Sequence, residues 1–410
     1  MDETKKRLIA DLHIHSRYAR GCSNAIDFDN LVKYARIKGI DLLGTGDFTH
    51  PKWFEEIKNF REKNGVYYHN GFPFLISGEV SLIYSQGRGR RVHLVILVPS
   101  IEIAEKIHTF LDSLGRRDYD GRPIFGISCI EFTKKMMEIS EDIELIPAHC
   151  WTPWFGIFGS KSGFDSLKEA FGEELEHIHA IETGLSSDPP MNWRIKELDK
   201  FTILSFSDSH SFWPWRMGRE ATIFDFRENE ELSYKKIIDD IRNNKILGTI
   251  EVDPAYGIYH YDGHRNCNFS CSPEETRKLN GICPVCNDKL IIGVDYRVDE
   301  LAEDDRKLGF KISNSKIFYK ILPLHEIIAL FTETGISTKK TWDIYNLLIE
   351  KFGNEFKVLL DVDKKDLLVE GFNEKLVDLI IRNRKGHIKV KPGYDGLYGV
   401  AVLEEQKTLF

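Results

Sequence analysis

The amino-acid sequence predicts an α/β barrel in the first half of the chain, followed by a small cysteine-rich domain and a helical C-terminal domain. Seven short apolar runs, mostly separated by amphipathic segments, precede residue 211, which is the pattern of alternating strands and helices. Nearly every run ends in a side chain that can bind a metal, and α/β barrels gather their catalytic groups where their strands end. Four of the seven cysteines lie close together between Cys267 and Cys286.

Length and composition are those of a folded protein with several domains. A chain of 410 residues is too long for one simple core, and 42% hydrophobic with 29% charged residues excludes a disordered chain. No apolar run reaches about 18 residues, the length that spans a membrane, and the N-terminus resembles no secretion signal, so we expect a cytoplasmic protein without a membrane partner. The net charge of -8 leaves DNA binding open, because acidic metal ligands contribute to it.

The predicted strands of the barrel are, in order, LIADLHIH, IDLLGTGD, FLISGEVSLI, RVHLVILV, IELIPAHC, AIETG and TILSFSDSH. Amphipathic segments such as FDNLVKYARIKG and IEIAEKIHTFLDSL separate most of them and are expected to be helices. The third and fourth strands are joined only by the basic turn YSQGRGRR, so that pair is expected to form a hairpin.

The later elements complete a layout of four regions. A helical connector containing NEELSYKKIIDDIRNNKIL follows the barrel, and short amphipathic helices such as PLHEIIALFTE, KTWDIYNLLIEKFG and NEKLVDLIIRNRKG fill the end of the chain. We therefore expect a catalytic barrel at 1–225, a helical connector at 226–258, a four-cysteine zinc-binding domain at 259–295, and an all-helical C-terminal domain at 296–410 that binds DNA.

Two histidines at the end of the first strand open the candidate metal site. His13 and His15 project from the same face, because side chains alternate along a strand. A lone His-x-His is usually incidental, but here further candidates end other strands: Asp47, Glu79, His149, Asp208 and His210. Mixed nitrogen and oxygen ligands suit Zn, Mn or Fe. Without cations, so many ionisable groups in one barrel mouth would cost several kcal/mol per unpaired charge.

These motifs resemble the PHP (polymerase and histidinol phosphatase) metal-dependent phosphoesterases. The resemblance implies a distorted (β/α)7 barrel and a set of metal ligands at His13, His15, Asp47, Glu79, His93, His149, Asp208 and His210. The family usually has His directly after the second-motif Asp, whereas this chain has Phe48 there, in GTGDFTHP. His50 either replaces that ligand or is an exposed turn residue before Pro51.

The cysteine cluster predicts a second, structural metal site. Its spacing is Cys267-x3-Cys271-x11-Cys283-x2-Cys286, and four thiolates in two pairs are what a closed tetrahedral zinc site requires. Cys22, Cys129 and Cys150 show no such spacing and are expected to be ordinary small apolar residues.

Two aromatic loops follow His149 and His210. They either form a wall against which a substrate base stacks or a barrel lid that packs on itself. Polar residues of the first loop are further candidates for base contacts. The substrate-binding candidates in these loops are Trp151, Trp154, Phe155, Ser160, Lys161, Trp213 and Trp215.

Basic residues near the C-terminus are candidates for phosphate contacts. In RNRKGHIKVKPGYDGLYG, Arg384, Lys385, Lys391 and Tyr394 either track a DNA backbone or belong to a solvated helix end. The final residues, EEQKTLF, match the first half of the motif that binds the sliding clamp PCNA, and either the motif is truncated or the match is accidental.

The whole combination resembles a family of DNA repair endonucleases within the PHP superfamily. The resemblance implies metal-dependent cleavage 5′ to hypoxanthine, uracil, xanthine or an abasic site in double-stranded DNA, with base flipping, leaving 3′-hydroxyl and 5′-phosphate ends. It also implies Zn²⁺ in the four-cysteine site, and Mg²⁺ or Mn²⁺, with Zn²⁺ a further candidate, in the active site. The alternatives are a phosphatase of a small phosphate ester, which leaves the zinc domain unused, and a non-catalytic DNA-binding scaffold.

Overall fold

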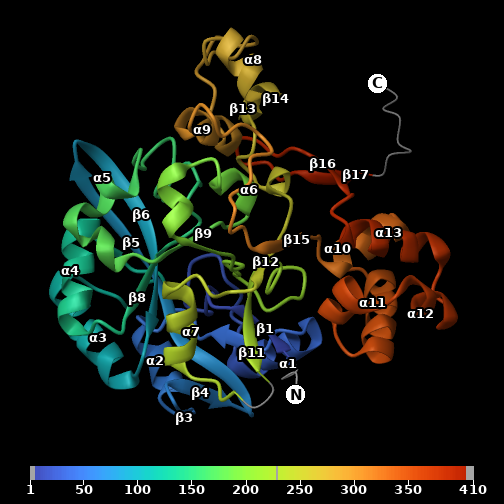
Figure 1. Ribbon diagram of the computed structural model, residues 1–410, viewed down its shortest axis with the longest axis horizontal. Coiled ribbons are helices and arrows are strands. Elements are labelled where there is room, and N and C mark those ends of the chain that lie inside the picture. The colour runs from blue at the N-terminus through green and yellow to red at the C-terminus, as the bar shows by residue number, and fades with distance from the viewer. Residues whose placement is uncertain (1–4, 228–229, 403–410) are drawn as a thin grey trace.

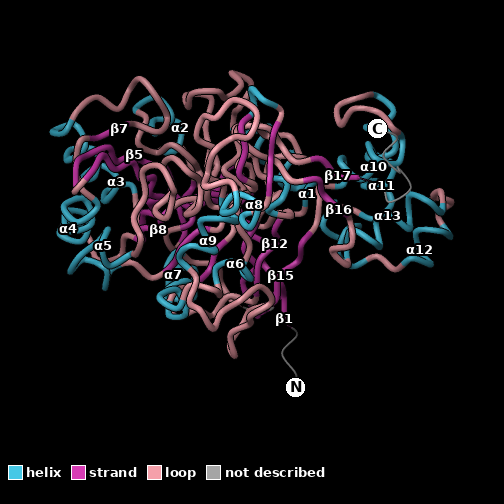
Figure 2. The backbone as a smooth tube through the Cα atoms, turned by 90° about the horizontal axis from the view of Figure 1, so that it is seen from above, coloured by secondary structure: helices cyan, strands magenta, loops and turns pink. Residues whose placement is uncertain are grey.

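The computed structural model describes residues 5–227 and 230–402 as a mixed α/β body that carries two smaller parts. Figure 1 shows the body from blue to yellow, a cysteine-rich module above it around α8 (Pro273–Lys278) and α9 (Val294–Leu301), and the late helices beside it. Seen from above in Figure 2, these late helices form a separate lobe next to the strand-rich body.

One large sheet runs through the body, and strands distant in sequence are neighbours in it. Its order is β15 (Ile317–Lys320), β12 (Gly248–Glu251), β11 (Ala221–Arg227), β1 (Lys5–Asp11), β2 (Leu42–Gly44), β5 (Phe72–Gln86), β4 (Val66–His69), β3 (Arg61–Lys63). The strands off this path are β6 (Arg88–Val98), β7 (Ile124–Phe125) and β8 (Glu144–Pro147).

A further parallel pair, β9 (Ala180–Glu182) and β10 (Thr202–Leu204), lies between β8 and the chain that follows β1. A bridge from Leu145 to Ile178 joins it to the β8 side, and a bridge from Ile14 to Ser209 joins it to the chain that follows β1. The ends of β1, β2, β8, β9 and β10 are thereby brought to one region of the body.

Helices cover the outside of the strands. Several begin with a serine or aspartate whose side chain accepts a hydrogen bond from the first turn, and Ser128 forms a full capping box with Glu131. The helices of the body are α1 (Phe28–Lys38), α2 (Pro51–Ile57), α3 (Ile101–Leu114), α4 (Cys129–Ile139), α5 (Leu167–Phe171), α6 (Pro189–Asn192) and α7 (Tyr234–Arg242). Short 3-10 turns lie at Gly172–His177, Lys196–Lys200, Pro254–Tyr256 and Arg265–Cys267.

All seven strands predicted from apolar runs are present, as β1, β2, β5, β6, β8, β9 and β10. The predicted hairpin is also confirmed, because β5 and β6 pair antiparallel over eleven residue pairs, from Ile76 with Val98 to Gln86 with Arg88. Gly87 supplies the left-handed turn between them, with φ of 69°.

Two expectations for the second half of the chain need correction. The connector at 226–258 contains α7 but also β12, which lies in the main sheet against β11. The region 296–410 is not all helical. Its first strand, β15, pairs parallel with β12, and β16 (Lys389–Lys391) pairs with β17 (Val400–Val402). These strands have three or four residues, too few for a clear alternating pattern.

The helical lobe spans a shorter segment than expected. Its helices are α10 (Leu324–Thr332), α11 (Lys339–Phe352), α12 (Lys364–Val369) and α13 (Glu374–Arg384), with a short π-helical turn at Lys357–Asp361. Among the described residues, no helix is long and apolar enough to span a membrane.

Candidate metal centre and active site

The chain just after β1, β8 and β10, together with the middle of β5 and β6, brings two groups of metal-binding side chains together inside the body. One group contains His13, His15, Glu79 and Asp208, and the other contains Glu79, His93 and His149. Within each group one ligand atom from each residue lies within 4.8 Å of the others. Glu79 belongs to both, so its carboxylate lies between two adjacent sites that could each hold an ion.

The donor atoms of the first group fit a divalent cation. The Nε2 atom of His13 is buried and has no hydrogen-bond partner among residues 5–227 and 230–402. It lies 3.6 Å from Oε2 of Glu79 and 3.7 Å from Oδ1 of Asp208. A buried nitrogen without a partner is costly, and imidazole with carboxylate is the donor set that Zn²⁺ and Mn²⁺ accept.

Two carboxylates behind these groups fix the orientation of the imidazole rings. The Nδ1 atom of His13 donates to Oε1 of Glu182 over 2.9 Å, and the Nδ1 atom of His15 donates to Oδ1 of Asp47 over 2.8 Å. Glu182 also accepts from the backbone amide of His149 over 2.7 Å. Each bond leaves the Nε2 atom of its ring directed at the metal group, which is how metal-binding histidines are usually held.

Opposite charges inside the site shift several pKa values. Burial lowers the pKa of His13, but the carboxylates of Glu182 and Glu79 outweigh it and raise that pKa well above its usual value. Burial raises the pKa of Glu79, but His93, Arg122 and His13 outweigh it and lower that pKa well below its usual value. Burial also lowers the pKa of His93 to about 4, so this imidazole stays neutral and can bind a metal.

The backbone is strained at three residues of the site. Asp47, His149 and Asp208 have φ values of 41°, 31° and 46°, in the left-handed region that residues with a Cβ rarely adopt. The chain is also tight at Gly184, where a Cβ would lie 2.5 Å from the Cβ of His149. Such strain persists where the surrounding structure enforces it, and it clusters at functional sites.

Three expected ligands lie outside both groups. Asp47 contacts His15 and the amide of Ser16. The ring of His50 stacks on Tyr18 with centroids 4.1 Å apart, and its Nε2 lies 3.2 Å from the carbonyl of Asp118. The ring of His210 lies 4.5 Å from that of His15, while its Nδ1 contacts the carbonyl of Asp208. Phe48, where a histidine was expected from the resemblance, is fully buried.

Two important site residues were missed by the sequence analysis. Glu182 lies in the run AIETG and is the last residue of β9, so the same rule that selected the other strand ends could have found it. Arg122 lies in the loop before β7, and its Nη1 atom donates to Oε2 of Glu79 over 2.9 Å. No local pattern marks Arg122, because its role depends on the folding of that loop against β5.

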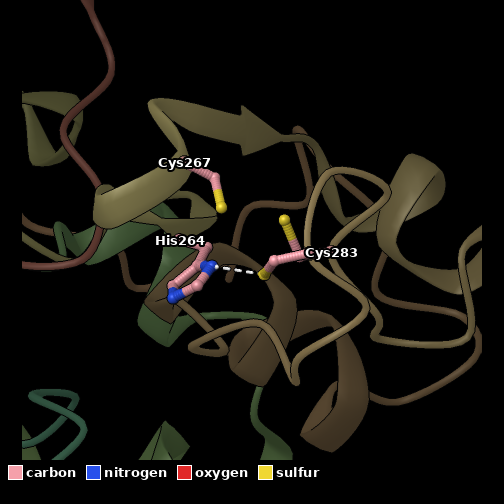
Figure 3. A group of neighbouring side chains, drawn as sticks. His264, Cys267 and Cys283 are labelled. Carbon is pink, nitrogen blue, oxygen red and sulfur yellow. Dashed lines mark hydrogen bonds between the residues drawn. The ribbon is translucent and has the colours of Figure 1, made fainter.

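The second metal site has a different ligand set from the one expected. Figure 3 shows the side chains of His264, Cys267 and Cys283 pointing toward one another, and Cys286 completes the group, its Sγ atom 3.2 Å from Nδ1 of His264. Cys271 is outside it, because its Sγ contacts Oγ1 of Thr276 over 3.2 Å.

The strand pairing explains this correction. β13 (Asp262–His264) and β14 (Phe269–Cys271) pair antiparallel, so His264 lies opposite Phe269 while Cys271 lies opposite Asp262, at the far end of the ladder. Cys271 is buried in a small core with Cys283 and Leu290, next to the group but outside it. The site is therefore a one-histidine, three-cysteine group, a common ligand set of structural zinc.

The two aromatic loops differ in what their side chains contact. Trp151 is fully buried and donates to Asn192 over 2.8 Å. Trp213 and Trp215 stack on each other at 5.2 Å and pack against Trp342 of α11. For these three rings the packing favours the second expectation, because they fill the interior and the contact with the helical lobe.

The rest of the first loop borders an open cavity of about 420 Å³. Trp154 and Lys161 line it together with Arg91, and the ring of Phe155 lies 4.3 Å from that of His93. The hydroxyl of Ser160 instead donates to the carbonyl of Ile292 in the cysteine-rich module. Aromatic and cationic groups therefore meet directly beside the second metal group.

Two of the C-terminal candidates have structural roles. Arg384 donates to the carbonyls of Val358, Leu359 and Val362, and Tyr394 is buried, with its hydroxyl donating to Asn268 over 2.9 Å. Lys385 and Lys391 are exposed. The clamp-binding half-motif, EEQKTLF, lies at 404–410, outside the described residues.

Comparisons with known proteins match both halves of the chain. A family model, the MJ0043 C-terminal domain, matches residues 323–387. The uncharacterized protein MJ0043 of Methanocaldococcus jannaschii is 32% identical over 300 residues, which are 72% of this chain but only 36% of that relative. The uncharacterized protein YqxK of Bacillus subtilis is 25% identical over 96% of this chain and 99% of its own length.

Two solved structures are similar over almost the whole chain. One is the lesion-specific endonuclease PfuEndoQ of Pyrococcus furiosus, with a TM-score of 0.86, 29% identity, and coverage of 98% of this chain and 96% of that one. The other is endonuclease Q with a 27-mer duplex substrate that has an abasic lesion at the active site, with the same TM-score and identity and 98% coverage of both chains. From this full-length similarity, we identify the protein as a member of the endonuclease Q family of DNA endonucleases.

Proposed function

We propose that this protein hydrolyses the phosphodiester bond on the 5′ side of a damaged nucleotide in duplex DNA. The observation that carries the proposal is the pair of buried histidine and carboxylate groups that share Glu79, in a chain that matches endonuclease Q from end to end. The targets are abasic sites and the deaminated bases hypoxanthine, uracil and xanthine, and the products carry 3′-hydroxyl and 5′-phosphate ends.

The body is then a PHP-type barrel whose ligands hold divalent ions. His13, His15, Glu79 and Asp208 would hold one ion, and Glu79, His93 and His149 would hold another. Mg²⁺, Mn²⁺ or Zn²⁺ bound there supplies Lewis-acid activation of water and charge neutralisation at the phosphate.

The protein's own side chains keep this site in its working geometry. Glu182 and Asp47 orient the imidazoles of His13 and His15, and Arg122 holds one oxygen of Glu79 while its partly exposed guanidinium offers a cation at the site. His210 lies at the open edge, beside His15. These donors and charges are fixed before substrate binds, which is the arrangement that lowers a barrier most.

Base selection would take place in the cavity beside the second group. A damaged or mismatched base costs least to extrude from the duplex, and aromatic rings accept a flipped base by stacking. Trp154, Phe155 and Lys161 border this region. The exposed Lys385 and Lys391, together with the zinc module, would contact phosphates, which position the duplex without selecting its sequence.

A nicking assay tests the proposal. The protein is incubated with Mg²⁺ or Mn²⁺ and end-labelled duplexes that carry one deoxyinosine, one abasic site or no lesion, and the products are resolved at single-nucleotide resolution. We expect a nick on the 5′ side of the lesion only. Nicking that is unchanged in the His13→Ala, His15→Ala double variant would contradict the assigned site, and phosphate release from a small ester without nicking would favour a phosphatase.

A further inference from the structure

We propose that Leu397 and Tyr398, at the exposed tip of the loop 392–399, form a wedge that enters the duplex beside the metal groups and fills the space of the extruded nucleotide. The inference rests on the proposed function and deepens it, because it names the part of the protein that would keep the duplex open at the lesion.

Side chains at this tip are unusually exposed for their chemistry. Tyr398 is 52% exposed and Leu397 is 39% exposed, and Val400 next to them is 59% exposed. Neighbouring exposed apolar side chains mark an interaction surface, since a soluble chain otherwise buries them. Proteins that unstack DNA insert apolar or aromatic side chains of this kind between base pairs.

The tip is held by a tight turn. Asp395 and Gly396 have φ values of 42° and 88°, the left-handed pair that a two-residue hairpin turn needs. Tyr394 and Leu397 close the turn through two backbone hydrogen bonds of 3.1 and 2.8 Å. The wedge residues therefore follow a short, ordered turn.

The rest of the loop is fixed to residues 255–258, the segment before the cysteine-rich module. The loop lies so close to it that a Cβ on Gly399 would be 2.1 Å from the carbonyl oxygen of Ala255. A loop ordered before it binds loses little entropy on binding, which suits an element that must push into stacked bases. Its amide donors bind successive carbonyls: Gly393 to Ala255 over 2.8 Å, Gly399 to Tyr256 over 3.1 Å and Gly396 to Ile258 over 2.9 Å.

Two arginines connect the tip to the metal centre. The guanidinium of Arg216 lies 5.7 Å from the ring centroid of Tyr398. Arg219 donates to the carbonyl of Ser207, the residue before Asp208, and interacts electrostatically with both Tyr398 and Asp208. Arg219 is held against this carbonyl and also interacts with the carboxylate of Glu220, so it supports the loop rather than the DNA. Among the described residues, Arg216 is half-buried and has no carboxylate within ion-pairing distance, so it can meet a phosphate beside the wedge.

Fluorescence of 2-aminopurine tests the wedge directly. The base is placed next to an abasic site in a duplex, and saturating protein is added with Ca²⁺. We expect a several-fold rise in fluorescence with the wild-type protein, retained in Tyr398→Phe and lost in Tyr398→Ala. Fluorescence anisotropy of a second label checks that Tyr398→Ala still binds the duplex, and Val369→Ala, at a 74% exposed apolar residue of α12, is the control.

An equal rise in the wild-type protein and Tyr398→Ala would overturn the wedge, and so would no rise in the wild type. A change in oligomeric state in Tyr398→Ala without loss of the rise would instead assign this surface to contact between copies of the chain.

Nicking separates failure of the wedge from failure of the proposed function. Absence of nicking in the wild-type protein contradicts the function itself. If the wild type nicks, Tyr398→Ala is expected to slow cleavage in duplex by roughly tenfold, as expected from the loss of one stacking contact, and to change cleavage of the same lesion in single-stranded DNA much less. Equal slowing on both substrates would overturn the wedge while leaving the endonuclease intact.

Discussion

Glu182 is the residue that connects the two metal groups from behind. It accepts a hydrogen bond from the ring of His13 and another from the amide of His149. Glu182→Gln keeps the size of the side chain but removes the charge, so we expect metal affinity to fall about 10–100-fold, the usual effect of losing such a partner. Titration of the metal-free protein with Mn²⁺, followed by calorimetry, measures this.

Glu144→Gln is the matched control for Glu182→Gln. Glu144 is likewise a buried strand carboxylate that accepts from a histidine ring, here Nδ1 of His179 over 3.0 Å. His179 belongs to neither metal group. Unchanged Mn²⁺ affinity is expected in Glu144→Gln, and an equal loss in both variants would mean that Glu182 acts through general stability.

The shifted pKa values predict how metal stabilises the protein as pH changes. The pKa of His13 is raised in the folded protein. Protonation of its ring therefore stabilises the metal-free protein fully at pH values below 6.5, the ordinary pKa of histidine. This contribution is lost as the pH rises through the pKa of the folded state. The pKa of Glu79 is lowered, so its contribution is present above 4.5 and lost as pH falls. Metal requires neutral imidazoles, so metal binding is favoured as pH rises.

We therefore expect the difference in melting temperature between Mn²⁺-loaded and EDTA-treated protein to grow from about pH 6 to about pH 8, because fewer protons must leave the imidazoles before metal binds. Each pKa unit by which a proton is held more tightly costs metal binding about 1.4 kcal/mol. Differential scanning fluorimetry at several pH values measures it. His50→Gln, outside both groups, should leave the slope unchanged. A difference that is constant with pH would contradict the exchange of protons for metal.

The sequence selects most members of the two groups but not the side chains that support them. Each predicted strand offers a candidate, so His13, His15, Glu79, His149 and Asp208 could be selected one strand at a time, although Glu79 lies in the middle of β5 rather than at its end. Asp47, chosen by the same rule, orients a ligand instead. Which strand end binds and which supports depends on side-chain direction in the folded state, and spacing alone does not encode it.

At the scale of elements, the cysteine-rich module shows what spacing can miss. The sequence pairs Cys267 with Cys271, but the β13–β14 hairpin places Cys271 at the far end of the ladder, where it contacts Thr276, and His264 joins the group instead. We expect His264→Ala to lower bound zinc from about one ion per chain toward zero, and Cys271→Ala to retain it. Release of zinc with a mercurial and a chromogenic chelator measures both. Retention in His264→Ala with loss in Cys271→Ala would restore the four-cysteine site.

Packing between elements also shows which of the two expectations for the tryptophan loop the structure favours. Trp213 and Trp215 follow a metal-binding strand end, which makes a substrate role attractive from sequence alone. The helical lobe packs onto that loop through Trp342 and His325, so both rings are part of a contact between segments that are distant in sequence. The short edge strand β15 is not predicted for a related reason. Its extended conformation depends on pairing with β12, which is distant in sequence.

For the whole molecule, one buried ion pair joins the body to the helical lobe. Nζ of Lys38, at the end of α1, donates to Glu355 over 2.6 Å, and Glu355 also accepts from the hydroxyl of Tyr345 and the amide of Leu324. Lys38 and Glu355 are 1% and 0% exposed. An exposed pair, Arg7 with Asp361, joins the same two parts at the surface.

Removing one charge from the buried pair should loosen the lobe. Glu355→Gln leaves the Lys38 ammonium buried without a counter-charge, so we expect unfolding free energy to fall by about 3–5 kcal/mol, whereas Asp361→Asn at the exposed pair should cost at most about 1 kcal/mol. Urea unfolding followed by tryptophan fluorescence measures this, and three of the seven tryptophans, Trp213, Trp215 and Trp342, lie at this contact. Lys38→Met combined with Glu355→Gln should recover part of the loss. Equal costs for Glu355→Gln and Asp361→Asn would show that the buried pair is not what holds the lobe against the body.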